Sequence, residues 1–442
     1  MRQGKPYILF VPTEIKKDID RCFKRNREIY YFIVFSLINS AVHDKEKTLN
    51  DFTPFNVSKI KKIINREPAY YIKNLKKYDI IKSDKKFIKG QKSYYYKLNP
   101  EYNIDCNTIK IEPGSKLHEG IYRNSRNKKK NLSKMPEYLH AMAKKFNDID
   151  LNYEGAYKWI ESQNEPEKRL IYSVAIEQFR DKRTRYFRRN KVNNRLDTNL
   201  TNLKKEIRTF LKNDFISIDL KNSQPFLLSI ILNQLINSNN SQHYSTIMLE
   251  VISLDPIKWF GNQKIKKIQN VVKNQKNEKL RHFEMLKQTQ KGNFYETFLN
   301  EFEGLTREQV KKIMFAVLYS RNSYYKDFQR FTPYRKEKEI FASLYPLEYQ
   351  IIEILKEKDH SRLAVFMQRL ESFIFIDCIA KELVNKDIIP LTIHDSILIE
   401  TRHKTQTLRI IKSIFQNKIG IIPSFHIEQL GQYYDEKITI KS

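Results

Sequence analysis

The chain has 442 residues, of which 81 are Lys or Arg and 51 are Asp or Glu, so its formal charge is +30. This length allows two or three domains, and the basic excess indicates an anionic polymer as partner. Nucleic acid fits better than a membrane, because the longest apolar run, residues 29–42, suits a buried helix and is too short to span a bilayer. The three cysteines lie far apart, which excludes a disulfide framework and a cysteine-rich zinc site. We expect a cytoplasmic protein.

The first 110 residues carry a helix, turn, helix and hairpin pattern. Residues 57–81 predict two helices that break near Pro68, and residues 82–98 predict two strands around a turn with Gly90. This is the order of a winged helix, so we expect residues 1–110 to bind DNA, with the second helix in a major groove. The candidate DNA-binding residues are Lys73, Asn74, Lys77 and Lys89. A small helical domain that binds protein is the alternative.

Basic residues are also dense in the next part of the chain. Residues 111–135 have the composition of a basic linker, and residues 136–190 predict helices. Six of the ten residues in 180–189 are Lys or Arg. Their mutual repulsion disfavours a free helix, so we expect this stretch to clamp the backbone of a duplex.

Two aspartates follow apolar runs of strand type. Asp219 ends the run 215–219, and Asp395 follows the run 391–393, after His394. Joining a nucleotide to a 3′-hydroxyl uses two divalent ions about 3.5 to 4 Å apart, and hard ions prefer oxygen ligands. We therefore expect Asp219 and Asp395 to be catalytic and to bind two Mg²⁺ ions, with the Leu220 carbonyl as a further oxygen and Mn²⁺ as the alternative ion. His394 would orient a carboxylate or the primer end.

A helical stripe lies between the two aspartates. Arg307, Lys311, Phe315 and Tyr319 are spaced by four residues, so they share one face of a helix. That face offers two cations to a triphosphate and two rings to a base. The alternative for the two rings is a pair that packs in the core.

The stripe resembles the O helix of the family A DNA polymerases, where Arg, Lys, an aromatic residue and Tyr recur at this spacing. Residues 193–203 are similar to the segment of that family that touches primer and template, and Gln368 holds the place of a residue along the minor groove. The five segments occur in the family's order, so the resemblance covers about residues 190–430 and leaves out the first 180. It implies that primer and template contact Arg195, Asn199, Asn202, Gln368 and His394.

The chain also departs from the family pattern. After Asp219 the family has Asp-Tyr-Ser-Gln-Ile-Glu, whereas residues 219–226 suggest two extra residues, with Gln224 beside the nucleotide and Phe226 in place of the Glu that screens the 2′-hydroxyl. Phe226 is then either a steric gate or part of the core. Residues 394–396 are His-Asp-Ser, as in the related single-subunit RNA polymerases, while Phe315 is closer to the DNA enzymes. The choice of sugar stays open.

The resemblance implies an α+β fold with the right-hand architecture of polymerases. The palm would comprise residues 211–232 and 345–442, and the fingers residues 233–344. Residues 136–210 would form thumb-like helices followed by the segment that contacts the primer. The leading function is synthesis of DNA on a primer–template from nucleoside triphosphates, without proofreading, because the first 180 residues have no acidic cluster suited to an exonuclease. One alternative is an RNA polymerase or primase, and another is a DNA-binding replication or regulatory protein with an inactive palm. Element replication, repair and defence all stay open as pathways.

Overall fold

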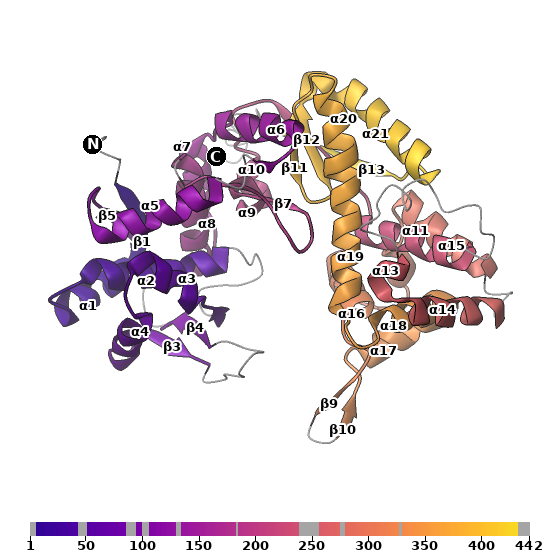
Figure 1. Ribbon diagram of the computed structural model, residues 1–442, viewed down its shortest axis with the longest axis horizontal. Helices are drawn as coiled ribbons and strands as arrows, with labels where there is room; N and C mark the ends of the chain where they lie inside the picture. The colour runs from indigo at the N-terminus through magenta and orange to yellow at the C-terminus, as the bar shows by residue number, and fades with distance from the viewer. Residues whose placement is uncertain are drawn as a thin grey trace. The chain divides into compact units, whose positions relative to one another are not determined.

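The computed structural model describes residues 6–42, 51–84, 94–99, 106–129, 134–182, 184–237, 256–274, 279–326 and 329–431. The chain forms two compact units (Figure 1). One unit contains Met1–Arg188, Asp197–Asp214 and Leu430–Ser442, and the other contains Arg189–Leu196 and Phe215–Gln429. None of the helices in the described ranges combines the length and the apolar character that crossing a bilayer requires.

The first unit begins with a two-stranded sheet beside two helices. Strand β1 (Tyr7–Pro12) runs antiparallel to β5 (Cys106–Ile111), with Tyr7 opposite Ile111. Helix α1 (Thr13–Cys22) follows β1, and helix α2 (Arg27–Val42) is the buried helix that the apolar run predicts. Because eleven residues of α2 are buried on all its sides, it forms the centre of this part of the unit.

A three-stranded sheet and two helices follow α2. The elements are β2 (Thr53–Pro54), α3 (Val57–Ile64), α4 (Pro68–Lys77), β3 (Ile81–Ser83) and β4 (Tyr95–Leu98), and the sheet order is β2-β4-β3. The Asn56 side chain caps α3, and Pro68 occupies the first turn of α4, where its missing N–H costs nothing. The predicted helices and strands are present. The turn between the strands, with Lys89, lies outside the described residues.

The segment expected to be a linker contains a helix instead. Helix α5 (Lys116–Lys129) starts after Ser115, whose hydroxyl accepts a hydrogen bond from the N–H of His118, and it packs against α3. At Gly120 an added Cβ would lie 1.9 Å from the Ile63 carbonyl oxygen, so only glycine allows this approach. Leu117 and Ile121 are buried, and this apolar face explains why the basic segment folds as a helix.

The rest of the first unit is helical. Its elements are α6 (Glu137–Asp148), α7 (Tyr153–Glu161), α8 (Pro166–Arg180), α9 (Asn199–Asn202) and α10 (Lys205–Arg208). The short strands β6 (Phe187–Arg189) and β7 (Leu196–Thr198) pair where the chain passes from one unit to the other.

Internal partners take up part of the positive charge of the basic stretch 180–189. Arg180 pairs with Glu177 at 2.7 Å, and Arg188 pairs with Asp197. Arg185 is only 5% exposed and donates hydrogen bonds to four backbone carbonyls, those of Phe146, Asn147, Ile149 and Phe179. These acceptors relieve part of the repulsion that the sequence suggests, while Arg180 and Arg188 stay about half exposed, so the role of the stretch as a clamp stays a prediction.

The second unit contains a four-stranded sheet of order β11-β12-β8-β13. Its strands are β8 (Phe215–Leu220), β11 (Leu391–Ile393), β12 (Ser396–Glu400) and β13 (Phe425–Leu430), and β12 runs antiparallel to both β11 and β8. Helix α21 (Lys404–Ile419) is amphipathic, with Thr407, Ile411 and Phe415 buried at a spacing of four residues. All four residues 215–218 of β8 are buried, so the sheet is held firmly where Asp219 follows.

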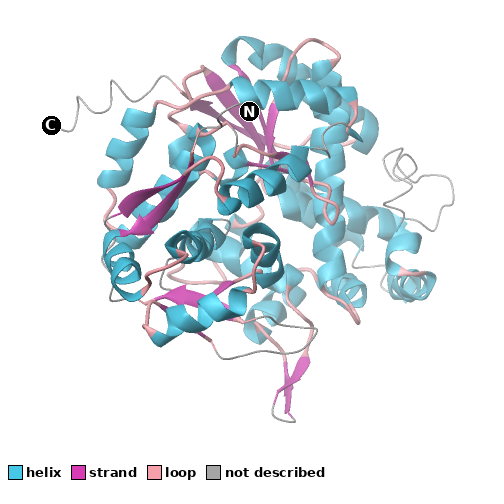
Figure 2. Cartoon of the chain, turned by 60° about the vertical axis from the view of Figure 1, so that its left-hand side comes forward, coloured by secondary structure: helices cyan, strands magenta, loops and turns pink. Residues whose placement is uncertain are grey.

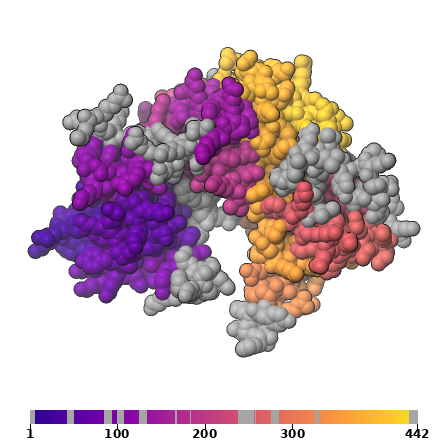
Figure 3. Space-filling model, in the orientation of Figure 1, coloured from indigo at the N-terminus to yellow at the C-terminus, as the bar shows by residue number. Residues whose placement is uncertain are grey.

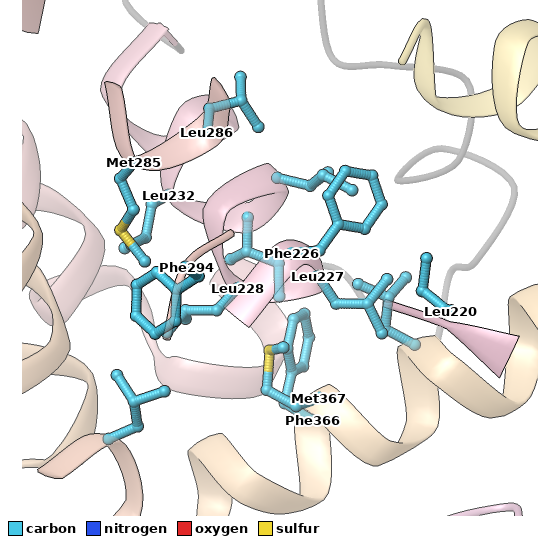
Figure 4. Close-up of a cluster of buried hydrophobic side chains, with 14 of the residues drawn as sticks. Leu220, Phe226, Leu227, Leu228, Leu232, Met285, Leu286, Phe294, Phe366 and Met367 are labelled. Carbon is cyan, nitrogen blue, oxygen red and sulfur yellow. The ribbon is translucent and has the colours of Figure 1, made fainter. Parts of the chain in front are cut away.

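Helices pack around this sheet and continue away from it. They are α11 (Ser223–Asn237), α13 (Pro256–Phe260), α14 (Asn262–Asn274), α15 (Lys279–Lys291), η4 (Glu296–Phe298), α16 (Arg307–Tyr319), α17 (Arg335–Leu344), α18 (Pro346–Lys356), α19 (Ser361–Ser372), η5 (Phe373–Ala380), α20 (Lys381–Val384) and the 3₁₀ turn η6 (Thr401–His403). A two-stranded hairpin, β9 (Tyr324–Lys326) and β10 (Gln329–Phe331), follows α16. One apolar cluster joins β8, α11, α16 and α19, and Figure 4 shows its part around Phe226 and Phe366.

Candidate active site

The pairing of β8 with β12 brings the two predicted aspartates together. Ser396 lies opposite Asp219 in the register, so Asp395 directly precedes the partner of Asp219. The N–H of Leu220 donates to the carbonyl oxygen of Asp395 at 3.2 Å. Two carboxylates from strands far apart in the sequence thus lie at the same end of one sheet.

A two-residue turn sets the position of Asp395. Ile393 and Ser396 are register partners, so only His394 and Asp395 join β11 to β12. Such turns require a positive φ at the first central residue, and His394 has φ 56°. A residue other than glycine in this conformation costs about 1–3 kcal/mol, and the paired strands on both sides hold it there.

The two carboxylates influence each other electrostatically. Burial raises the pKa of Asp395, and the negative charge of Asp219 raises it further. Like charges held this close repel, and a divalent cation between them would relieve that repulsion.

Two serines that sequence reasoning missed hold Asp219 in place. The hydroxyl of Ser217 donates to Oδ1 of Asp219 at 3.1 Å and lies 2.5 Å from the hydroxyl of Ser396. Ser217 precedes Asp219 by two residues, and side chains two apart on a strand share a face. That alternation is the signal that could have identified Ser217. Ser396, the third residue of His-Asp-Ser, contributes to this chain of hydrogen bonds rather than adding a carboxylate.

Helix α16 presents the predicted stripe on its less buried face. Val310, Met314, Val317 and Leu318 are buried, whereas Arg307 is exposed and Lys311, Phe315 and Tyr319 are partly exposed. The rings of Phe315 and Tyr319 are 6.0 Å apart. The four side chains therefore form one row along the helix, in which both rings are partly exposed and Tyr319 also packs against the apolar core.

The first turn of α16 reaches the segment that follows Asp219. Arg307 donates to Oε1 of Glu296 at 2.6 Å and to Oδ1 of Asn222 at 3.5 Å, and its guanidinium lies 5.3 Å from the ring centre of Tyr295. Thr306 and Gln309 form a capping box that fixes where the helix begins. Arg307, one of the two cations of the stripe, is thus held beside the segment that follows Asp219.

A buried hydrogen-bond network connects the far end of α16 to three other segments. The Tyr319 hydroxyl donates to Oε1 of Gln224 at 2.9 Å, and Nε2 of Gln224 donates to Oε2 of Glu371. Glu371 also receives two hydrogen bonds of 2.9 Å from Arg195. We call Tyr319, Gln224, Glu371 and Arg195 the amide network.

Glu371 is the member of this network that sequence reasoning missed. It is 1% exposed, and burial raises its pKa to about 7, although Arg195 opposes the rise and Asp395 adds to it. The signal was the one acidic residue of α19, three positions after Gln368. Gln368 itself accepts a hydrogen bond of 3.0 Å from Asn193.

The structure corrects the expected place of Phe226. Its side chain has no exposed surface, and its ring packs 6.2 Å from that of Phe415 (Figure 4). The turn between β8 and α11 is short, so Gln224, five residues after Asp219, is the residue that reaches Tyr319. In the family pattern the Glu also lies five residues after the Asp, so Gln224 takes its place without the two extra residues that the sequence suggested. Phe226 is a core residue rather than a contact of the sugar.

Two of the expected primer contacts bond to other groups of the first unit. Asn199 is 2% exposed, accepts from the N–H of Tyr186 and donates to the Gln178 carbonyl. Asn202 donates to the Tyr186 hydroxyl at 2.6 Å. Asn199 is thus committed to the interior, whereas Asn202 is partly exposed, and its contact with the primer stays a prediction.

Helix α4 presents part of its predicted surface. Lys73 and Lys77 are exposed, and Tyr70 beside them is 63% exposed. Asn74 instead donates to the Tyr30 hydroxyl of α2 at 2.9 Å, so it faces the helix on which α4 packs. The available surface of α4 is therefore a set of lysines and a tyrosine.

Asp219 and Asp395 have the chemistry that a magnesium ion requires. Within the described ranges, no three His, Cys, Asp or Glu side chains gather into a group that could hold a metal ion unaided. Mg²⁺ commonly takes only one or two protein carboxylates and completes its shell with water and substrate phosphates. The two aspartates and the nearby Leu220 carbonyl are all hard oxygen ligands, so they fit this ion.

No protein-family model and no curated protein matches the chain. Among solved structures it is similar to the POL domain of Pol1 from M. smegmatis in complex with DNA primer-template and dNTP. The identity is 11%, the TM-score is 0.26, and the match covers 70% of this chain and 63% of that chain. The chain thus spans less than two thirds of the length of that structure, and functional assignment depends on the site itself.

Proposed function

We propose that this chain is a template-directed nucleotidyltransferase that extends a primer by two-metal phosphoryl transfer. The observation that carries the proposal is the β8–β12 pairing, which places Asp219 beside the turn of Asp395 while Arg307 of α16 contacts Asn222. Two carboxylates facing a row of cations and rings form a site for a metal-bound triphosphate and its base.

Each part of the site has a role in this proposal. Asp219 and Asp395 would hold Mg²⁺, which when bound neutralises charge on the transferred phosphate. Arg307 and Lys311 bind the triphosphate, and Arg307 is kept in place by Glu296. Phe315 and Tyr319 contact the base, and Arg195 and Gln368 lie with the primer–template. The Ser217–Ser396 pair orients Asp219.

The architecture proposed for the chain follows from its elements. The sheet that bears the aspartates is the palm, and the helices from α13 to α17 are the fingers. In the first unit, the order α2-β2-α3-α4-β3-β4 and the sheet order β2-β4-β3 support a winged helix. Lys73 and Lys77 would then contact duplex DNA.

DNA synthesis is the leading activity, and RNA synthesis or priming is the second candidate. The residues beside Tyr319 are the reason to keep RNA synthesis or priming as a candidate. An amide, Gln224, rather than a carboxylate lies beside Tyr319, and Phe226 is too deeply buried to act as a gate. An amide can both donate to and accept from a 2′-hydroxyl, so the site has no evident barrier of charge or volume against ribonucleotides.

A primer-extension assay with Asp395→Asn tests the proposal. The substitution keeps the shape of the side chain and removes one charge from the pair, so extension should fall by several orders of magnitude while duplex binding is retained. Asp387→Asn is the matched control, because Asp387 is exposed and its φ of 57° suits asparagine. Near-normal extension by Asp395→Asn would refute the assignment. Comparing dNTPs with NTPs, with and without a primer, decides between the two candidate activities.

A further inference from the structure

The β9–β10 hairpin and the start of α17 expose an unusual group of aromatic side chains. Phe331 is 46% exposed and Tyr334 is 49% exposed, and both follow α16 within fifteen residues. Tyr324 packs on Phe331 with the ring centres 5.1 Å apart. The hairpin extends away from the helices of its unit, and the space-filling view shows its orange base uncovered on this face (Figures 2 and 3). The rings therefore lie on an open surface.

Basic residues surround these rings. Residues 321–336 contain five Lys or Arg and one Asp. Arg321, Arg330 and Lys336 are exposed, and Arg330 donates to the Ser323 hydroxyl at 3.2 Å, which holds it along the hairpin. Arg335 pairs with Glu339 and contributes less. The surface thus combines exposed rings with positive charge.

The backbone at Tyr334 gives a second, independent indication. Tyr334 precedes the first residue of α17 with φ 55° and ψ 46°, a left-handed conformation that a bulky side chain rarely adopts. Glycine or asparagine would fit this position with less strain. The ring of this strained residue is half exposed, and such strain is concentrated at sites that bind ligands.

We propose that the hairpin surface, Tyr324, Arg330, Phe331, Tyr334 and Lys336, binds an unpaired nucleic-acid strand by stacking its bases on the rings and pairing its phosphates with the cations. Sequence-tolerant binding of single strands uses this combination of aromatic and basic side chains. The surface follows the candidate nucleotide-binding helix directly in the chain. If the proposed function holds, the occupant is the template strand ahead of the site of synthesis. Only the naming of the strand as template depends on that function.

The test measures binding of a fluorescent oligothymidine to the full-length chain, without metal or nucleotides. Phe331→Ala with Tyr334→Ala should weaken binding by roughly ten- to a hundredfold, since loss of one stacked base costs about a factor of ten. Ile427→Ala removes a side chain of similar exposure, 37%, from β13 and should leave the affinity unchanged. Binding of a blunt duplex should change little in either variant.

Two further variants separate binding from folding and from charge. Tyr334→Gly removes the ring and also the backbone strain, so its melting temperature should equal or exceed that of the wild type while single-strand affinity falls. Arg330→Ala with Lys336→Ala should lower the salt slope of single-strand binding by about 1.4, which the aromatic variants should not do. Unchanged single-strand affinity in the aromatic variants, or an equal loss on the blunt duplex, would overturn the proposal. A chain that fails to extend primers but shows these losses still supports it.

Discussion

The hydroxyl of Tyr319 donates a 2.9 Å hydrogen bond to the side-chain carbonyl of Gln224. This contact joins the last residue of α16 to the first turn of α11, only five residues beyond Asp219. The same amide bonds to Glu371, which holds Arg195. Hydrogen bonds therefore connect the end of α16 to the segment that follows Asp219 and to Arg195, in the segment expected to contact the primer.

Loss of the Tyr319–Gln224 contact should alter the choice of sugar. Tyr319→Phe removes one hydrogen bond, worth about 0.5–1.5 kcal/mol, and leaves the ring in place. We expect the ratio of kcat/KM for dNTP and NTP to change by roughly three- to tenfold. Steady-state kinetics with both nucleotide types measure the ratio, and Gln224→Ala should change it in the same direction.

Phe226→Ala should destabilise the fold without changing this ratio. Truncating a fully buried phenylalanine costs about 3–5 kcal/mol. Denaturant unfolding should show this loss, and the nucleotide preference measured on the remaining folded protein should match the wild type. A changed preference would mean that Phe226 influences the sugar after all.

Glu371 should make stability depend on pH. Its pKa is raised from 4.5 to about 7 in the folded chain, so between those values the folded state holds a proton that the unfolded state has lost. Stability attributable to this group is therefore present below pH 4.5 and decreases as pH rises toward 7, by up to about 3 kcal/mol. Glu371→Gln carries no titrating group, so its stability should fall less than that of the wild type between pH 5 and pH 8. Denaturant unfolding of both proteins at pH 5 and pH 8 measures the two losses of stability. An equal loss in the variant and the wild type would contradict the prediction.

Arg185→Lys should lower the melting temperature markedly and should not act chiefly on nucleic-acid binding. The guanidinium serves four carbonyls at once and lies 4.1 Å from the ring centre of Phe179, a geometry that an ammonium group cannot reproduce. Thermal unfolding measures the loss. Arg335→Lys, at an ion pair with Glu339 in which both side chains are exposed, is the control and should change stability by well under 1 kcal/mol.

Lys73→Ala with Lys77→Ala should reduce duplex affinity and its dependence on salt. Each lost phosphate contact lowers the slope of log affinity against log salt by about 0.9, so the double variant should lose about 1.8. Lys386→Ala, another exposed lysine, should leave the slope unchanged. Asn74→Ala should instead reduce stability, because Asn74 bonds to Tyr30.

Local patterns in the sequence predict much of this structure. The apolar runs before Asp219 and Asp395 gave β8 and β11, and the spacing of four placed Arg307, Lys311, Phe315 and Tyr319 on one face of α16. These features depend on residues close together in the chain, where side-chain period and backbone geometry decide the outcome.

Features that depend on distant partners could not be predicted in the same way. Glu371 joins the candidate site through its bond to Arg195, 176 residues away. Arg185 donates its hydrogen bonds to carbonyls of two helices. Gln224 stays a predicted site residue, and its bonds to Tyr319 and Glu371 could not be foreseen from the sequence. Composition reveals that a charge exists, whereas only the fold shows which group satisfies it.

The two-residue turn between β11 and β12 makes chain length itself a constraint on the site. Neighbouring groups can compensate for many substitutions around Asp395, because Ser217, Ser396 and Arg195 surround the carboxylates from separate segments. Neighbouring groups cannot compensate for a residue that is inserted into this turn or deleted from it. It would shift β12 by one position and turn every side chain of the strand to the opposite face of the sheet. Related chains should therefore tolerate changes of residue at His394 far better than any change in the length of this turn.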